Sequence, residues 1–242
     1  MIYRIDGKEG RPWIVFSNSL GTNMSMWDDQ VNFLYNDYRI LRYETIGVGR
    51  KSIDDLGKDL LHLMDTLEIP SAHFCGISLG GLIGQWLAIN ATDKFLSFAF
   101  SNTAPSIGSD EGWQQRIAQV KKEGLESVRK ASSGRWFTQG FIERYPSKVE
   151  KALKGFDETR PEDYIALCEV LAKTNLWDGL PKINKPVLIL AGAQDEVTTV
   201  AEAQKMGELI PQSVVKVLEA SHLSNFEDPC FNEYLFNHIS RD

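Results

Sequence analysis

The chain has 242 residues, 43% of them hydrophobic and 24% charged, and its formal net charge is −7. These values fit one globular domain with a sizeable core, and an acidic chain without a basic run argues against a nucleic-acid partner. The sequence contains neither an 18-residue apolar stretch nor an N-terminal signal core, so we expect a cytoplasmic protein that does not bind membranes.

The first part of the chain alternates apolar, strand-like runs with helical patterns. Strands are expected at 2–5, 13–16, 38–43, 72–75 and 95–100, and helices at 27–35 and from Ser52 onward. The run Ser52-Ile53-Asp54-Asp55 has the pattern of a capping box, which places a helix start there. Strands that alternate with helices at this spacing predict an α/β fold: a mostly parallel, twisted sheet with helices on both faces.

The centre of the sequence is the run Cys75-Gly76-Ile77-Ser78-Leu79-Gly80, a G-x-S-x-G motif with Gly81 behind it. It stands between an apolar strand and an apolar helix face. The small residues let strand and helix cross closely, so Ser78 is held in a strained backbone shape at the carboxyl edge of the sheet. This pattern is typical of the nucleophile elbow of the α/β-hydrolase fold, although a plain glycine turn before a helix would also fit it.

The alternation breaks between residues 104 and 178, where the pattern predicts helices alone. They are expected at 113–123, 125–131, 139–142, 148–156 and 161–172. A helical insertion over the edge where Ser78 emerges predicts a lid, whereas helices that complete the core are the alternative. We therefore expect a core made of residues 1–104 and 179–242, and a lid made of residues 105–178.

The sheet resumes after this insertion. Strands are expected at 186–190 and 214–218, and helices at 201–210 and 229–239. Asp195 follows the first of these strands, and His222 follows the second. A serine nucleophile needs a base, the base needs an orienting acid, and serine–acid–histidine is the chain order of this fold. We therefore expect Ser78, Asp195 and His222 to meet at one sheet edge as a catalytic triad.

Other residues could fill these roles. Asp178 and Glu196 are the substitutes to test for Asp195, whereas His62, His73 and His238 lie inside expected helices or strands and indicate structural or surface roles.

An acyl-transfer site also needs two backbone N–H donors for the oxyanion. One is expected from Leu79, directly after the nucleophile, and the other from Leu20, in the loop after the strand at 13–16.

Two runs point to a particular family: Ser-Asn-Ser-Leu-Gly-Thr at 17–22 and Ala-Ser-His-Leu-Ser-Asn at 220–225. With residues 52–57, 72–81 and 135–138, they resemble the 3-oxoadipate enol-lactonases, α/β-hydrolases of the bacterial β-ketoadipate pathway of aromatic degradation. In one place the chain differs from that family. The family's loop typically reads Asp-Thr-Arg-Gly-His-Gly and continues for several more residues, whereas residues 44–51 lead straight into the helix at Ser52, so one wall of the pocket is expected to differ.

The resemblance implies hydrolysis of an anionic lactone, a five-membered enol-lactone with an acetate arm, through an acyl-enzyme on Ser78. It implies no metal or cofactor, and the three cysteines form no C-x-x-C pair, so reduced thiols are expected. Arginine binds a carboxylate through two parallel hydrogen bonds. Arg135 is the candidate for the acetate arm, beside Trp136 as a pocket wall or as lid core. Four other arginines of the same region remain open for that role: Arg116, Arg129, Arg144 and Arg160.

Two further functions remain open. One is an esterase or carbon–carbon bond hydrolase for another small carboxylated substrate, and the other is a non-catalytic binding protein on the same scaffold. A haloalkane dehalogenase is disfavoured, because that chemistry uses an aspartate where Ser78 stands. The sequence does not predict an oligomeric state.

Overall fold

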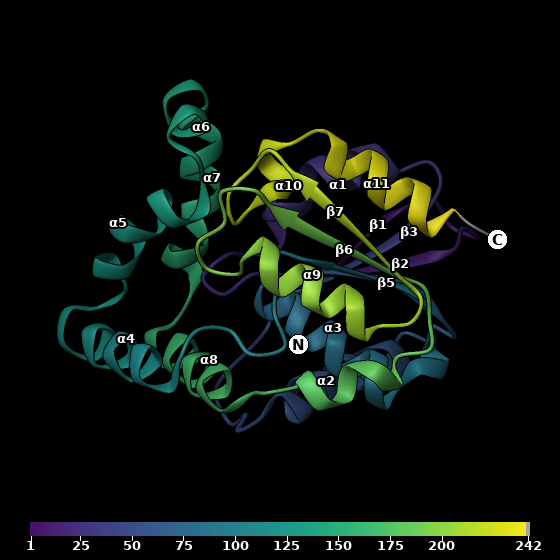
Figure 1. Ribbon diagram of the computed structural model, residues 1–242, viewed down its shortest axis with the longest axis horizontal. Coiled ribbons are helices and arrows are strands. Elements are labelled where there is room, and N and C mark those ends of the chain that lie inside the picture. Colours follow the sequence, from purple (N-terminus) through teal and green to yellow (C-terminus); the bar gives the residue numbers. More distant parts are fainter. Residues whose placement is uncertain (241–242) are drawn as a thin grey trace.

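The computed structural model describes residues 1–240, and within them seven strands form one open sheet in the order β1-β3-β2-β4-β5-β6-β7 (Figure 1). The strands are β1 (Tyr3–Gly7), β2 (Trp13–Ser17), β3 (Arg39–Tyr43), β4 (Ala72–Ile77), β5 (Phe95–Ser101), β6 (Val187–Gly192) and β7 (Ser213–Leu218). β1 runs antiparallel to β3, and every other pairing is parallel. The expected α/β class and its mostly parallel sheet are therefore confirmed.

Helices cover both faces of the sheet, as the alternation predicts. On one face lie α2 (Ile53–Thr66), α3 (Leu79–Asn90) and α9 (Val200–Leu209), and on the other lie α1 (Asp28–Leu34), α10 (Ser224–Glu227) and α11 (Cys230–Ile239) (Figure 1). The capping box at the start of α2 is confirmed, because Ser52 accepts from the Asp55 N–H and the Asp55 carboxylate accepts from the Ser52 N–H.

The central strands are buried on both sides, which explains why their sequences are continuously apolar rather than alternating. In β2, Val15 packs into the core on the α2–α3 side, whereas Ile14 and Phe16 pack on the α1–α11 side. In β4, Phe74 and Cys75 divide between the two faces in the same way. Two apolar layers therefore fix the sheet, and its carboxyl edge is free to carry polar side chains.

Five helices follow β5 before the sheet resumes: α4 (Asp110–Glu123), α5 (Leu125–Trp136), α6 (Gln139–Arg144), α7 (Pro146–Glu158) and α8 (Pro161–Lys173). They lie together beyond the carboxyl ends of the parallel strands, at the left of Figure 1. We call residues 105–178 the helical insertion. A short 3-10 segment, η3 (Trp177–Lys182), then leads back to β6.

The helix α5 is longer than its sequence pattern indicates, since the expectation ended it at residue 131 and the helix continues to Trp136. Ser132, Ser133 and Gly134 are poor helix formers, so propensity alone favours a stop there. Packing extends the helix, because Ser132 and Trp136 are buried and the Trp136 ring stacks on Phe156 of α7 at 5.3 Å.

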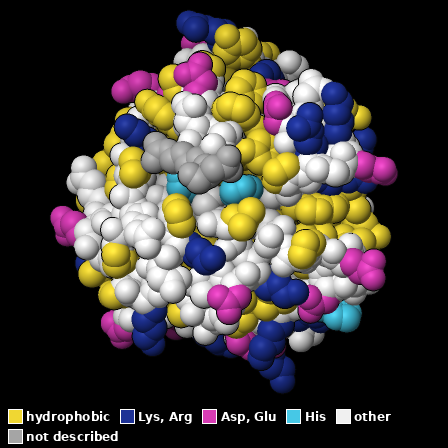
Figure 2. Space-filling model, turned by 90° about the vertical axis from the view of Figure 1, so that its right-hand side faces the viewer, with side chains coloured by type: hydrophobic (Ala, Val, Ile, Leu, Met, Phe, Trp, Pro, Cys, Tyr) yellow, Lys and Arg dark blue, Asp and Glu magenta, His cyan; other side chains and the backbone are white. Residues whose placement is uncertain are grey.

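The face of the molecule away from the insertion carries acidic, basic and apolar side chains interspersed with one another (Figure 2). Within residues 1–240, no helix combines the length and the apolar character that crossing a bilayer requires.

Candidate active site

Ser78 lies in the sharp turn between β4 and α3 with φ 56° and ψ −116°, which is a rare conformation for a residue with a side chain. The backbone of Ser78 is held on both sides: its N–H donates to Ser101 at 3.1 Å, and its carbonyl accepts from the Thr103 hydroxyl at 2.8 Å. The turn also requires glycine at 80, since a Cβ there would lie 2.2 Å from the Ser17 carbonyl oxygen. The structure therefore has the strained strand–serine–helix geometry that the motif predicts.

Asp195 and His222 are buried and joined by a hydrogen bond of 2.9 Å between the imidazole Nδ1 and the carboxylate Oδ2. The remaining carboxylate lone pairs accept from the Val197 and Thr198 N–H groups, the Thr198 hydroxyl and the Asn102 amide. Burial by itself would raise the pKa of Asp195, but the neighbouring His222 and these donors outweigh it and lower the pKa to about 2. Since an ionised carboxylate only accepts, His222 donates from Nδ1, and its Nε2 is left free to accept a proton.

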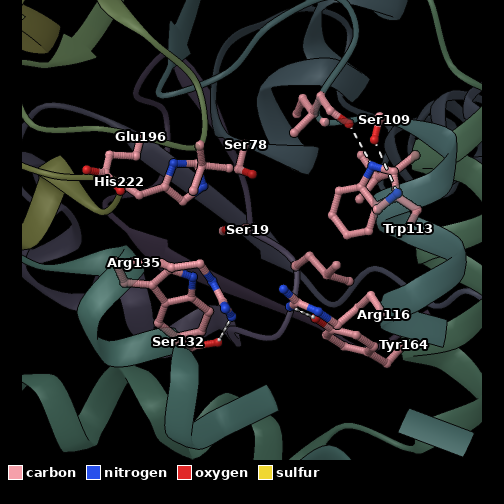
Figure 3. Close-up of a pocket in the computed structure, with 17 residues that line it drawn as sticks. Ser19, Ser78, Ser109, Trp113, Arg116, Ser132, Arg135, Tyr164, Glu196 and His222 are labelled. Atoms are coloured by element: carbon pink, nitrogen blue, oxygen red, sulfur yellow. Dashed lines mark hydrogen bonds between the residues drawn. The ribbon is translucent and has the colours of Figure 1, made fainter. Parts of the chain in front are cut away.

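Ser78 and His222 line the same cavity, of about 290 Å³, and lie beside each other at its upper edge in Figure 3. In the described part of the chain no hydrogen bond joins the serine hydroxyl to the imidazole, and such contacts are often long in sites without substrate. The structure thus brings together Ser78, Asp195 and His222 from the ends of three parallel strands or the loops that follow them.

Of the two residues expected to supply the oxyanion donors, Leu79 directly follows Ser78 in the chain and Leu20 lines the cavity with Ser78. Leu79 is the first residue of α3, where backbone N–H groups have no acceptor within the helix. Leu20 lines the cavity in the loop after β2, and among residues 1–240 its N–H donates to no protein acceptor. Neither N–H group is therefore taken by a protein acceptor in the described part of the chain, and the oxyanion role of Leu20 and Leu79 stays a prediction.

Two arginines of the helical insertion line the cavity opposite Ser78: Arg135 from α5 and Arg116 from α4 (Figure 3). Arg135 donates to the Ser132 hydroxyl at 2.9 Å, and Arg116 donates to the Tyr164 hydroxyl at 3.4 Å. Neither has an acidic partner among the described residues. Burial lowers the pKa of Arg135, and the positive charge of Arg116 lowers it further. Two guanidinium groups without an acidic partner have the chemistry that binding an anion requires.

The other arginines of the insertion lie outside the cavity. Arg129 pairs with Glu150 and Asp157, Arg160 pairs with Asp163, and Arg144 is exposed. Trp136 meets both expectations for it, because it lines the cavity and also stacks within the insertion.

Among the described residues, none of the competing side chains forms a hydrogen bond with Ser78 or His222. Glu196 reaches the edge of the cavity but is exposed, and Asp178 lies in η3. His62 is exposed. His73 contacts the Ser97 hydroxyl, and His238 contacts the Phe98 carbonyl, both away from the cavity. Within residues 1–240, no group of three His, Cys, Asp or Glu side chains is arranged to hold a metal ion.

Sequence reasoning gave no site role to Trp113, Tyr164 or Asn102. The sequence did indicate which face of α4 is turned inward, because Trp113 and Arg116 lie at helical spacing from the buried Ile117 and Val120. Asn102 directly follows β5, at the edge where functional side chains gather, and its amide donates to Asp195 and to the Ser221 carbonyl.

The short loop at 44–51 lies on the far side of Ser19 and Leu20 from the cavity that contains Ser78. Its residues 44–46 line a second cavity of about 400 Å³. The Gly47 and Val48 N–H groups both donate to the Asp163 carboxylate of α8, at 3.0 and 2.9 Å. The loop therefore attaches the helical insertion to the core.

Comparison with known proteins gives consistent results. A family profile described as "alpha/beta hydrolase fold" matches residues 12–229. The chain is 45% identical to 3-oxoadipate enol-lactonase 2 of Acinetobacter baylyi, over 98% of this chain and 90% of that protein. It is 38% identical to 3-oxoadipate enol-lactonase 1 of the same organism, over 93% of this chain and 87% of that protein. The crystal structure of the enol-lactonase from Burkholderia xenovorans LB400 superposes with a TM-score of 0.96 at 38% identity, covering 99% of this chain and 96% of that one.

Proposed function

Because the chain belongs to the α/β-hydrolase family and, within it, to the 3-oxoadipate enol-lactonases, we propose that it hydrolyses 3-oxoadipate enol-lactone to 3-oxoadipate. The observation that carries this proposal is the strained Ser78, which lines one cavity with His222 while His222 is bonded to Asp195. Opposite them, Arg116 and Arg135 offer a site for the acidic arm of such a lactone.

In the first half of the reaction, the Ser78 hydroxyl attacks the lactone carbonyl carbon and passes its proton to His222 Nε2. The Leu20 and Leu79 N–H groups stabilise the oxyanion of the tetrahedral intermediate. The carbon–oxygen bond of the ring then breaks. The enol oxygen leaves with the proton that His222 returns, and the enol tautomerises to the ketone.

In the second half, His222 takes a proton from water as the water oxygen attacks the Ser78 acyl carbon. The intermediate collapses, Ser78 Oγ regains its proton from the imidazole, and the second carboxylate of 3-oxoadipate is released. Asp195 stays ionised throughout, because its pKa of about 2 lies far below neutrality, and it stabilises the imidazolium formed in each half.

The helical insertion has the role of a lid in this proposal, with residues 105–178 above a core of residues 1–104 and 179–242. Its contribution is the anion site, since Arg116 and Arg135 both belong to it. The arm of the lactone would lie along the Trp136 side of the cavity, with its carboxylate at the two guanidinium groups and its ring at Ser78.

The test is turnover of the enol-lactone by the purified protein and by its Ser78→Ala variant, beside simple aryl esters. We expect wild-type protein to open the lactone and the variant to lose that activity while it stays folded. Fast turnover of esters without turnover of the lactone would favour the esterase alternative. A folded wild-type protein whose Ser78 does not react with a fluorophosphonate probe would instead support a binding protein.

A further inference from the structure

Glu227, at the end of α10, has no part in the chemistry above, yet its carboxylate joins the segment that carries Arg135 to the segment that carries His222. One oxygen accepts from the N–H and the hydroxyl of Thr138, at 2.9 and 2.7 Å. The other oxygen accepts from the Ser221 N–H at 2.6 Å. Thr138 lies just beyond Arg135 and Trp136, and Ser221 directly precedes His222.

Two further hydrogen bonds link the same segments. The Leu223 N–H donates to the Trp136 carbonyl at 2.9 Å, and the Ser221 hydroxyl donates to the Arg135 carbonyl at 3.2 Å. The two residues on either side of His222 are therefore bonded to the backbone carbonyls of Arg135 and Trp136, Ser221 through its hydroxyl and Leu223 through its N–H. These bonds fix how far the anion site lies from the reacting pair.

The two sides of this connection are not equally supported. The His222 segment is also held by the core, because Asn102 donates to the Ser221 carbonyl at 3.0 Å and Asp195 binds the imidazole. Residues 135–138 of the insertion, in contrast, are hydrogen-bonded to the core through Ser221, Leu223 and Glu227. Loss of the Glu227 carboxylate should therefore displace the arginine more than the histidine.

Apolar packing should keep the segments together without that carboxylate. The Phe137 ring meets the Phe226 ring edge to face at 5.6 Å. Such packing resists separation but is not directional, whereas hydrogen bonds specify the register between two backbones. A Glu227 variant should thus fold and keep its lid in place, with Arg135 less closely aligned.

We propose that Glu227 is a positioning residue that sets the distance between Arg135 and the Ser78–His222 pair, and so selects lactones by the length of their acidic arm. The inference rests on the proposed function, because it takes the arm carboxylate to bind at Arg135. A displacement of about 1 Å between a binding group and the reacting groups can cost about a hundredfold in rate.

The test compares wild type with Glu227→Gln on three substrates: the acetate-arm enol-lactone, its homologue with one more methylene in the arm, and an uncharged aryl ester. The glutamine side chain keeps one acceptor oxygen and carries an NH₂ group in place of the other. That NH₂ group faces one of the donors, so the bridge is broken without loss of volume. Asp228→Asn is the matched control, because the Asp228 carboxylate accepts from the Glu219 and Cys230 N–H groups, away from the cavity.

We expect Glu227→Gln to lower kcat/KM for the acetate-arm lactone about tenfold or more, mainly through KM, with less than about threefold change for the aryl ester. The preference of wild type for the acetate arm over the longer arm should shrink, and Asp228→Asn should retain it. Thr138→Val removes the hydroxyl that donates to Glu227 and that also caps α6 by accepting from the Phe141 N–H, and it should give a smaller change in the same direction. Thr138→Ser keeps the hydroxyl and should not.

An equal loss on all three substrates, together with a lower melting temperature, would make Glu227 purely structural and overturn the proposal. An unchanged preference between the two arms would overturn it as well. If wild type hydrolyses the aryl ester but neither lactone, the proposed function itself fails, and that result is visible before any variant is compared.

Discussion

The proposal that Arg116 and Arg135 bind the carboxylate of the substrate is tested directly by Arg135→Ala. Arg135 is half-buried, lines the cavity with Ser78 and has no acidic partner among residues 1–240, so its truncation leaves no protein carboxylate unpaired. A hydrogen bond to a charged group contributes about 1.5–3 kcal/mol. At about 1.4 kcal/mol per factor of ten, removal of one such bond weakens binding roughly 10- to 150-fold.

The single variant should fall at the lower end of this range, because Arg116 remains in the cavity and is relieved of the like charge of Arg135. We therefore expect KM for the carboxylated lactone to rise about 10- to 30-fold, with kcat changed less than about threefold. The double variant Arg116→Ala/Arg135→Ala should lose about a hundredfold or more in kcat/KM. Neither should greatly affect an uncharged aryl ester.

The assay is steady-state kinetics on both substrates, with the exposed Arg144→Ala as the matched control from the same insertion. Arg135→Lys separates charge from geometry, since a lysine keeps the charge but cannot form the two-pronged contact. Equal losses on the lactone and on the ester would mean that Arg135 supports the fold, and an unchanged KM for the lactone would refute the anion site.

Three further predictions concern the elbow, the acid and the insertion. Ser78→Gly should be more stable to denaturant than Ser78→Ala by about 1–2 kcal/mol, because glycine tolerates φ 56° and ψ −116°; equal stability would show that the turn holds no strain. The pKa of Asp195 is lowered from 3.8 to about 2 in the folded protein. The ionised carboxylate therefore contributes about 2 kcal/mol to the free energy of unfolding above pH 4, and this contribution is lost as the pH falls toward 2. When the free energy of unfolding is measured as a function of pH, Asp195→Asn should lack this loss between pH 4 and pH 2. A pH dependence parallel to that of wild type would contradict the prediction. Gly80→Ala should destabilise by several kcal/mol, since its Cβ would lie 2.2 Å from the Ser17 oxygen, whereas Gly134→Ala has open space and should stabilise α5 by about 0.5–1 kcal/mol in thermal melts.

Local patterns in the sequence were sufficient to predict the strands of the sheet and most helices that cover it, although not the short helix α10. The central strands β2, β4 and β6 coincide with apolar runs, and the start of α2 follows from the capping box at Ser52. The position of Ser78 at a strand–helix turn was predictable for the same reason, because the glycines around it are required by contacts of the chain with its immediate neighbours.

The extent of α5 and the choice among arginines could not be predicted in this way. Both depend on which side chains of separate helices face one another, and the periodicity of one helix does not contain that information. Arg116 and Arg135 stand 19 positions apart and belong to different helices, yet they line one cavity, whereas Arg129 finds Glu150 and Asp157 instead.

The sequence by itself determined the order of the sheet strands along the chain, the turn that holds Ser78, and the two loops that carry its base and its acid, because each depends on short-range pattern and on parallel strands ending at one edge. Only the tertiary structure decided that Asp195 rather than Glu196 binds His222, that two arginines face the cavity without an acidic partner among residues 1–240, and that Glu227 ties the insertion to the histidine loop. Those contacts join residues far apart in the chain, and three-dimensional packing alone sets their distances.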